Sequence, residues 1–405
     1  MSGPRWIPTM LLLTAFQVFS FAQVIFTTDG TNMTALIVLA LYVAVEWLYA
    51  VISSVILRKN SLALEIIAFF LTGISLAVVT TSGKTTLITQ FAAFAAGLAV
   101  YIVLLWMLAN VDRAEKFRVP MAVAAIVFLV FGLIFAKAKN GALNWVTIGG
   151  VTFQPSELVK VMFIFVGAAT LEKIQTTKNI RNYVIFAVVC VGLLFLMRDL
   201  GTALIFFFTF VILAFMRSGD VRTILFVVLA AAMGAVLLVL VKKNYVMNRF
   251  ATYRHIWETP YGNGMQQTRT LVYSVSGGLL GMGIGQGKLR SIFAATEDLI
   301  FGVVCEEWGL IIGFIVALTY VLIFIHSIRN AKGSRSAFYS IASCAAGSLI
   351  LFQAALNIFG VTDLLPLTGV TLPFVSHGGS STLSCWGLLA FIKAADNRTW
   401  AGGKK

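Results

Sequence analysis

Residues 296–327 read TEDLIFGVVCEEWGLIIGFIVALTYVLIFIHS, a polar start that leads directly into a long apolar run. From Leu299 onward the run is long enough to cross a hydrocarbon layer about 30 Å thick, which needs roughly 20 apolar residues. Asp298 stands where the preceding polar segment meets this run. Because a carboxylate at the edge of the membrane costs solvation free energy, the sequence marks Asp298 as a candidate for function.

The whole chain has the composition of an integral membrane protein. Of its 405 residues, 59% are hydrophobic and 11% are charged, and the mean hydropathy of +0.93 is far above that of soluble domains. Backbone groups in lipid must pair within each apolar run, so the runs should be helices. The predicted fold is therefore an all-α polytopic bundle of about 12 transmembrane helices. The runs lie near residues 8–28, 33–57, 62–81, 87–110, 119–137, 154–172, 182–197, 200–217, 221–241, 299–327, 337–360 and 374–394.

Lysine and arginine residues are distributed unevenly between the two sides of the predicted membrane. With the N-terminus inside, most of them fall in cytoplasmic segments, and the short outer loops hold only Lys84, Lys137, Lys139 and Arg198. This positive-inside pattern predicts a multi-pass protein with both termini in the cytoplasm. It also places residues 242–298 outside, as a large loop before the third-last helix.

The net charge of +14 follows mostly from this bias, and it favours contact with membrane lipid headgroups over binding to nucleic acid. The outer loop is the exception, since the positive-inside trend does not explain its cations and an anionic ligand would. The cysteines are scattered singly and the histidines lack the spacing of zinc ligands, so neither disulfides nor a zinc site is predicted. The cations of the loop are Lys242, Lys243, Arg249, Arg254, Arg269, Lys288 and Arg290.

Two short polar motifs stand at the predicted outer ends of helices. In QPSELVK, Glu157 lies one turn before Lys160, which predicts an ion pair and leaves Gln154 as the better candidate for substrate contact. In MRDLGTAL, Asp199 is predicted to cap the helix that begins near Gly201. A purely structural role is the simpler interpretation for Glu157 and Asp199.

The glycine-rich stretch GGLLGMGIGQGKLR, residues 277–290, resembles a phosphate-binding loop only superficially. It has neither the GxxxxGK[ST] nor the GxGxxG pattern, and no βαβ unit surrounds it. Two interpretations stay open. Backbone N–H groups beside Lys288 and Arg290 bind a phosphate, or the glycines allow close packing against a helix.

Four carboxylates gather at the start of residues 296–327: Glu297, Asp298, Glu306 and Glu307. Asp298 and Glu306 would share one face if the segment were a single helix. Neighbouring carboxylates at low dielectric raise one another's pKa, which would give a base strong enough for a sugar hydroxyl, whereas a bridging divalent cation would hold them ionised. A proton or ion relay of the transporter kind is the alternative.

Five blocks together resemble the FtsW/RodA/SpoVE family, the shape, elongation, division and sporulation (SEDS) proteins. They occur in the family's order over residues 141–393. The combination of QPSE-x-x-K with GGSS is highly specific for this family. The blocks are GALNWVTIGGVTFQPSELVK, RDLGTALI, SVSGGLLGMGIGQG, EDLIFGVVCEEWG and LPLTGVTLPFVSHGGSS.

The resemblance implies a peptidoglycan glycosyltransferase of the bacterial cytoplasmic membrane. Such an enzyme polymerises lipid II at the outer face and works with a class B penicillin-binding protein as transpeptidase. The family's motif places the catalytic residue at Asp298, as general base, with undecaprenyl diphosphate as the leaving group. No cofactor is implied with certainty, although a divalent cation, Mg or Mn, would stabilise the diphosphate. The substrate-binding candidates are Lys288, Arg249, Arg254, Gln154, Ser156, Glu157, Lys160, Asp199, Glu297, Glu306, Glu307 and Ser380.

Two departures from the family pattern bear on fold and activity. Family members typically have ten spans, so the resemblance implies a ten-helix core with two extra helices at the N-terminus. We expect N-terminal membrane helices in residues 1–117 and the SEDS-type core in residues 118–405. The segment SIFAATED lacks the Leu-Pro-Glu triplet and the His-Thr-Asp usual in the family, which indicates a divergent member.

Two other functions stay open as alternatives. A lipid-linked precursor flippase or transporter needs access from both sides of the membrane but no general base, and the outer position of most polar motifs argues against it. A catalytically inactive scaffold for a transpeptidase is the second, because the residues just before Asp298 depart from the family pattern.

Overall fold

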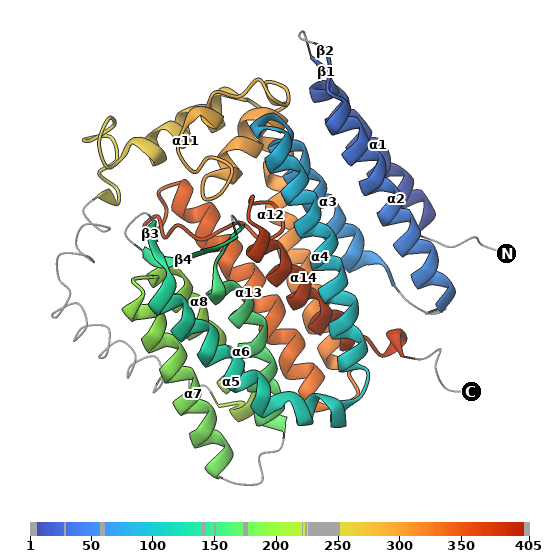
Figure 1. Ribbon diagram of the computed structural model, residues 1–405, viewed down its shortest axis with the longest axis vertical. Helices are drawn as coiled ribbons and strands as arrows, with labels where there is room; N and C mark the ends of the chain where they lie inside the picture. Colours follow the sequence, from blue (N-terminus) through green and yellow to red (C-terminus); the bar gives the residue numbers. More distant parts are fainter. Residues whose placement is uncertain are drawn as a thin grey trace.

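The computed structural model describes residues 6–27, 30–56, 61–139, 142–149, 151–172, 177–220, 222, 225 and 252–400. These residues form a bundle of long helices with two small sheets at its edges (Figure 1). The helices are α1 (Ile7–Ile25), α2 (Met33–Ile56), α3 (Ala63–Val79), α4 (Lys84–Leu108), α5 (Val111–Phe135), α6 (Pro155–Glu172), α7 (Thr177–Leu196), α8 (Leu200–Ser218), α11 (Met265–Ser276), α12 (Ile300–Lys332), α13 (Ala337–Val361) and α14 (Gly379–Ala394), with short 3-10 turns at Thr80–Ser82, Leu289–Ser291 and Asn397–Thr399.

The helices confirm the predicted membrane bundle. Each predicted run within the described residues coincides with a helix, and the run at 221–241 lies almost wholly outside them. Among the described residues, eight helices are long and apolar enough to cross a membrane. α6 falls outside this group because it carries Glu157, Lys160 and Glu172, and α14 because it has only 16 residues.

Three helices start five or more residues away from the predicted position, and α7 is one of them, since it begins at Thr177 rather than at residue 182. α14 begins at Gly379 rather than at residue 374, because Phe374 adopts a positive φ of 64° and the chain ahead of the helix forms a loop. α5 begins at Val111, ahead of the predicted start at residue 119. The side chain of Asn110 accepts a hydrogen bond from the backbone N–H of Asp112 and caps this polar first turn.

Two antiparallel sheets were not part of the all-α prediction. β1 (Phe26–Thr27) pairs with β2 (Gly30–Thr31) between α1 and α2, and a second sheet leads from α5 into α6. Within it Asn144 and Val146 are buried and Thr147 is exposed, the alternation of a strand with one covered face. The second sheet consists of β3 (Lys137–Lys139), β4 (Ala142–Ile148) and β5 (Val151–Phe153).

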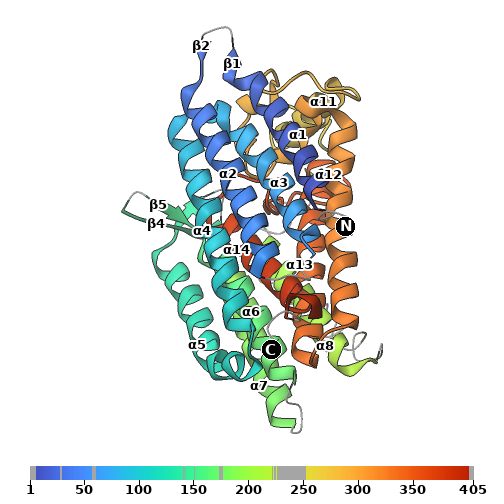
Figure 2. The same cartoon turned by 90° about the vertical axis from the view of Figure 1, so that its right-hand side faces the viewer.

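α14 forms the centre of the bundle (Figure 1), where it packs against α4, α13 and α6. Nearly all of its side chains are buried. α1 and α2 stand at the edge, against α3 and α4 (Figure 2). Only 33% of the spanning window of α1 and of α2 is buried, compared with 78% for α3 and 72% for α13. The first two helices are therefore a peripheral hairpin that exposes apolar side chains to lipid.

α12 is interrupted at Gly309, where φ is 88°. The turn at residues 277–283 inserts at this break and pairs with the backbone groups that the broken helix leaves open. The N–H of Met282 donates to the carbonyl oxygen of Glu306 (2.9 Å), and the N–H of Leu310 donates to that of Gly278 (3.0 Å). Irregular backbone near the membrane is stable here because protein partners satisfy it.

Candidate functional site

One cleft of about 680 Å³, a volume that includes its open mouth, lies at the end of the bundle where α6, α8, α12 and α14 begin. We call this the cleft end. Gln154, Glu157, Asp199, Glu297 and Asp298, all predicted site residues, line it together. The full lining is Asn144, Trp145, Gln154, Glu157, Arg198, Asp199, Leu200, Thr202, Glu297, Asp298, Thr368, Gly369, Val370, Thr371 and His377.

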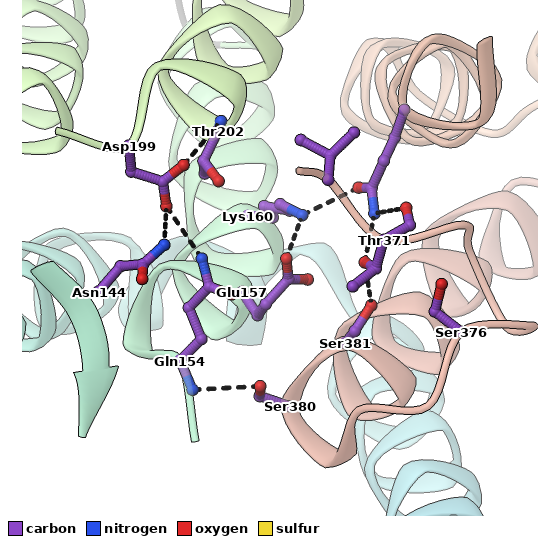
Figure 3. Close-up of polar contacts among 12 residues, drawn as sticks. Asn144, Gln154, Glu157, Lys160, Asp199, Thr202, Thr371, Ser376, Ser380 and Ser381 are labelled. Carbon is purple, nitrogen blue, oxygen red and sulfur yellow. Dashed lines mark hydrogen bonds and ion pairs between the residues drawn. The ribbon is translucent and has the colours of Figure 1, made fainter. Parts of the chain in front are cut away.

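Asp199 caps α8 and also joins the sheet to α6. Its Oδ1 accepts a hydrogen bond from the backbone N–H of Thr202 (3.1 Å), which confirms the predicted cap. Its Oδ2 accepts from the side-chain amides of Asn144 (2.8 Å) and Gln154 (2.9 Å), as Figure 3 shows. The carboxylate is thus fixed in place by three donors from three parts of the chain, with Gln154 at the start of α6 directly beside it.

Glu157 and Lys160 form the predicted ion pair, with Lys160 Nζ 2.6 Å from Glu157 Oε1. Both side chains are buried, and Lys160 also donates to Gln353 Oε1 of α13 (2.9 Å). Gln353 in turn donates to the carbonyl oxygen (2.9 Å) and hydroxyl (3.1 Å) of Thr371. The pair therefore connects α6, α13 and the loop ahead of α14 under the cleft, and only Glu157 of the two reaches the lining.

Asp298 lies two residues before α12, and the backbone around it is held by the C-terminal part of the chain. The carbonyl oxygen of Thr296 accepts from the N–H of His377 (2.8 Å), and that of Glu297 accepts from the hydroxyl of Ser376 (2.5 Å). The carbonyl oxygen of Asp298 accepts from Asn357 Nδ2 (2.8 Å). Three consecutive carbonyl groups are thus fixed, which pre-positions the carboxylate in the cleft before any ligand binds.

Gly369 lies directly beside the Asp298 carboxylate. It adopts a positive φ of 69°, and a Cβ built there would lie 3.5 Å from Asp298 Oδ2, an ordinary van der Waals contact. The constraint on position 369 is therefore its left-handed backbone, which favours glycine. The loop of residues 368–371 forms one wall of the cleft.

Glu306 and Glu307 are buried but do not line the cleft. α12 begins at Ile300, after Asp298, so the predicted shared helix face of Asp298 and Glu306 is wrong. Glu306 accepts backbone N–H groups from Lys288 (2.7 Å) and Leu289 (3.0 Å), and Glu307 pairs with the guanidinium of Arg290. The two glutamates hold the loop at residues 288–290 against α12. They would therefore affect substrate binding only by positioning this loop.

For residues 277–290 the structure favours the close-packing interpretation over the phosphate-binding one. The N–H groups of Met282 and Gly283 donate to carbonyl oxygens of α12, that of Ile284 donates to Gln23 Oε1 of α1 (2.9 Å), and those at 288 and 289 donate to Glu306. None of these backbone groups is left for a phosphate. The alternative interpretation, close packing of glycines against a helix, describes this segment.

Four further predicted residues lie away from the lining. Lys288 is exposed on the loop, and Arg254 is exposed with its guanidinium over the ring of Tyr253 at 5.6 Å. Ser156 is buried in the first turn of α6. Ser380 in α14 accepts the backbone N–H of Gln154 (3.2 Å) and so joins α14 to the start of α6. Arg249 lies outside the described residues.

The cleft includes residues that the sequence analysis did not select, notably Asn144, Arg198 and His377. Arg198 lies in the tight turn between α7 and α8 with a positive φ of 58°, a strained conformation of the kind that is common at functional sites. Of the described residues that line the cleft, it is the one lysine or arginine. Its position directly before Asp199 in the RDLGTALI block was the available signal.

The described part of the chain contains no group of three His, Cys, Asp or Glu side chains that could hold a metal ion. Mg²⁺ is commonly bound through one or two carboxylates together with substrate phosphates. The residues present fit such a site, because Glu297 and Asp298 are neighbours on the lining and would supply the carboxylates. The phosphates of the substrate would supply the other ligands.

Comparison with known proteins shows which family has this architecture. The family model described as cell cycle protein, FtsW/RodA/SpoVE, matches residues 54–399. The chain belongs to the FtsW/RodA/SpoVE family. The match starts near the end of α2, so nearly all of the peripheral hairpin precedes it, in agreement with two extra N-terminal helices. The boundary at residue 117, between the N-terminal helices and the SEDS-type core, stays a prediction.

Individual members of the FtsW/RodA/SpoVE family agree with the predicted enzyme class. A probable peptidoglycan glycosyltransferase FtsW of Buchnera aphidicola is 30% identical over 281 residues, which cover 66% of this chain and 70% of that protein. Stage V sporulation protein E of Bacillus subtilis is 31% identical over 293 residues, which cover 69% of this chain and 79% of that protein.

Solved structures show the same fold. A chain of a peptidoglycan synthase complex, described as coordinating polymerization and crosslinking, has a TM-score of 0.70 at 23% identity and covers 84% of this chain and 98% of its own. The rod shape determining protein RodA of Thermus thermophilus has a TM-score of 0.62 at 22% identity, with 85% and 98% covered. These similarities support the helical membrane architecture.

Proposed function

We propose that the protein is a peptidoglycan glycosyltransferase that polymerises lipid II, with Asp298 as general base. The observation that carries this proposal is the placement of Asp298 on the cleft, with three consecutive backbone carbonyls held in place around it. Family membership and the names of the relatives support the reaction class. A rigidly held carboxylate beside an open polar cleft is what proton abstraction from a bound hydroxyl requires.

In the proposed reaction, the carboxylate of Asp298 accepts the proton of the 4-hydroxyl of the acceptor N-acetylglucosamine. The oxygen attacks the anomeric carbon of the donor N-acetylmuramic acid, and the bond to the diphosphate oxygen breaks. Undecaprenyl diphosphate leaves with the electron pair as an anion, so no second carboxylic acid needs to protonate it, in contrast to the glycosidases. Direct displacement inverts an α-linked donor to a β-1,4 product.

Arg198 is our candidate for the cation that stabilises the departing diphosphate. Of the cations selected from the sequence, Lys288 and Arg254 do not line the cleft and Arg249 lies outside the described residues, whereas Arg198 does line it. A guanidinium can contact phosphate oxygens with two parallel hydrogen bonds. A divalent cation, Mg²⁺ or Mn²⁺, would add charge neutralisation if the substrate's own phosphate oxygens completed its coordination.

The proposed location is the bacterial cytoplasmic membrane, with both termini inside and the cleft end outside. The distribution of lysine and arginine supports this orientation. The proposed partner is a class B penicillin-binding protein, because a chain of the same fold is part of a synthase complex that both polymerises and crosslinks. On this orientation the nascent glycan would emerge on the side where crosslinking takes place.

The test is polymerisation of labelled lipid II by the purified protein, with and without the cognate transpeptidase. We expect Asp298→Asn to lower the rate by about 10²- to 10⁴-fold, the usual contribution of a general base. Glu258→Gln is the matched control, since it removes a carboxylate whose side chain is 72% exposed on the same loop and does not line the cleft. We expect this variant to keep the wild-type rate.

Each other outcome identifies a different function. A wild-type rate for Asp298→Asn would remove Asp298 from the chemistry. Transport of lipid II across a vesicle membrane without glycan product would support the flippase, and the absence of both activities in the presence of the partner would support the scaffold.

A further inference from the structure

α11 has an inverted distribution of side chains for a helix on a protein surface. Its buried residues are Gln267, Thr268 and Thr270, all of them polar. Val272 and Val275 are exposed, the latter at 69%. A helix at the surface of a soluble domain buries its apolar face and exposes its polar one. α11 therefore presents apolar side chains on the side that faces away from the protein.

The apolar surface continues beyond the end of the helix. Val272, Val275 and Leu279 follow one another at spacings of three and four residues, and Leu280 is 83% exposed. Together with Met282, which is also exposed, these five side chains form what we call the α11 stripe. Contiguous exposed apolar side chains mark contact with another protein or with a membrane.

The α11 stripe is continuous with the lipid-facing surface of α12. The N–H of Ile311 donates to the carbonyl oxygen of Leu279 (3.3 Å), so the turn that carries the stripe lies directly against this helix. Ile311 and Phe314 of α12 are exposed, Phe314 at 70%, within a helix apolar enough to cross a membrane. The material that covers these side chains in α12 is lipid, and the stripe borders it.

The depth of the turn agrees with this position. The last turn of α12 carries Arg329 and Lys332, which end its apolar part. About 20 residues cross the hydrocarbon layer, so the spanning part of α12 extends back from Arg329 to about Leu310. Leu310 is the residue whose N–H pairs with Gly278 of the turn. The stripe therefore lies at the boundary between hydrocarbon and headgroups, and Figure 2 shows α11 at the same end of the bundle as the start of α12.

The residues that precede α11 are typical of a membrane boundary. Trp257 and Tyr261 are exposed, and the guanidinium of Arg269 lies over the ring of Tyr261 at 5.8 Å. Tryptophan and tyrosine are enriched at the headgroup level of membranes, and basic residues on the polar side of an amphipathic helix favour anionic lipid.

We propose that the α11 stripe is inserted into the leaflet at the cleft end, so that α11 lies along the membrane surface. The bilayer itself covers the stripe, at the depth where acyl chains meet headgroups. Because the turn at 277–283 is hydrogen-bonded to α12 beside Glu306 and Glu307, insertion anchors the loop that leads to Asp298. The insertion does not depend on the proposed glycosyltransferase activity.

A spin label at Leu280 tests the proposal in the full-length protein, reconstituted alone into lipid nanodiscs. The label is attached to Leu280→Cys, and labelled wild type controls for the native cysteines, all four of which are buried. Oxygen partitions into the bilayer and a nickel chelate stays in water, so power saturation reports the depth of the label. We expect collision with oxygen to exceed collision with nickel several-fold at Leu280, and the reverse for Glu258→Cys on the same loop.

Equal access of the nickel chelate to Leu280 and Glu258 would overturn the proposal, because the stripe would then lie in water and await a protein partner. Val275→Cys repeats the measurement on the helix itself if the variant at Leu280 does not fold. A water-exposed label at Val275 would overturn the proposal equally.

Discussion

Asp298 owes its position to contacts made by its backbone, and Asn357 makes the contact closest to it. Asn357 Nδ2 donates to the carbonyl oxygens of Asp298 (2.8 Å) and Val370 (2.7 Å). Asn357→Ala leaves both carbonyl groups without this donor, at about 1–3 kcal/mol for each buried group. A displacement of about 1 Å costs on the order of 100-fold in rate, so we expect kcat for lipid II polymerisation to fall about 10- to 100-fold with a smaller change in KM.

The matched control is Asn330→Ala in α12. Asn330 is also buried and its amide donates to the carbonyl oxygen of Ile392 (3.0 Å), far along the helix from the cleft. Both variants should lose thermal stability, but only Asn357→Ala should lower kcat of the folded enzyme. Equal kcat in the two variants would show that Asn357 serves stability alone.

Residue contacts could be predicted where both partners lie within about one turn of helix. Glu157 with Lys160, and Asp199 with the start of α8, are contacts of this kind, and the structure contains both. The donors to the carbonyls of Glu297 and Asp298 come from residues 79 and 59 positions away. Periodicity and capping rules describe neighbours along the chain, so they gave no sign of Ser376 or Asn357.

At the scale of elements, the broken helix α12 and the turn at 277–283 depend on glycine at specific positions. Gly281 has φ of 84°, and a Cβ there would lie 2.2 Å from the carbonyl oxygen of Glu307. Gly278 has φ of 59° and open space around its Cβ position. Gly278→Ala should therefore cost only about 1–2 kcal/mol for a left-handed alanine, whereas Gly281→Ala should cost about 1–3 kcal/mol more through steric overlap.

Thermal unfolding of the two alanine variants in detergent measures this difference. Gly278 and Gly281 both have a positive φ, so backbone strain largely cancels between the two variants. The contact of position 281 with α12 then decides the difference in melting temperature. Equal melting temperatures for the two variants would mean that the turn does not insert at the break.

The helices themselves followed from hydrophobic runs, but the break at Gly309 and the small sheet ahead of α6 did not. An apolar run long enough to span the membrane has the same sequence pattern whether its helix is continuous or is broken where a turn from another part of the chain inserts. The glycines of the turn indicated close packing without identifying its partner. The same limit applies to Glu306 and Glu307. Their spacing from Asp298 along the sequence predicts a shared site, whereas in the structure their side chains contact the loop at Lys288 and Arg290.

At the scale of the whole molecule, a buried ion pair joins α3 to the central helix α14 and also accepts a hydrogen bond from the peripheral hairpin. Lys393 Nζ of α14 lies 2.7 Å from Glu65 Oε1 of α3, and both side chains are buried. The hydroxyls of Tyr49 in α2 and Tyr101 in α4 donate to the same oxygen, at 3.0 and 2.9 Å. Four helices therefore meet at one carboxylate, at the end of the bundle opposite the cleft.

Removal of one charge from this pair should lower the free energy of unfolding more than removal of both charges. Lys393→Met leaves Glu65 buried without its cation, and breaking a buried pair in this way costs about 3–5 kcal/mol. Glu65→Gln combined with Lys393→Met leaves no buried charge and still lets the two tyrosines donate to an amide oxygen, so most of the lost stability should return. Melting temperatures of the two single variants and the double variant test this, and a double variant no more stable than Lys393→Met would mean that the ion pair itself, rather than the avoidance of a lone buried charge, holds the four helices together.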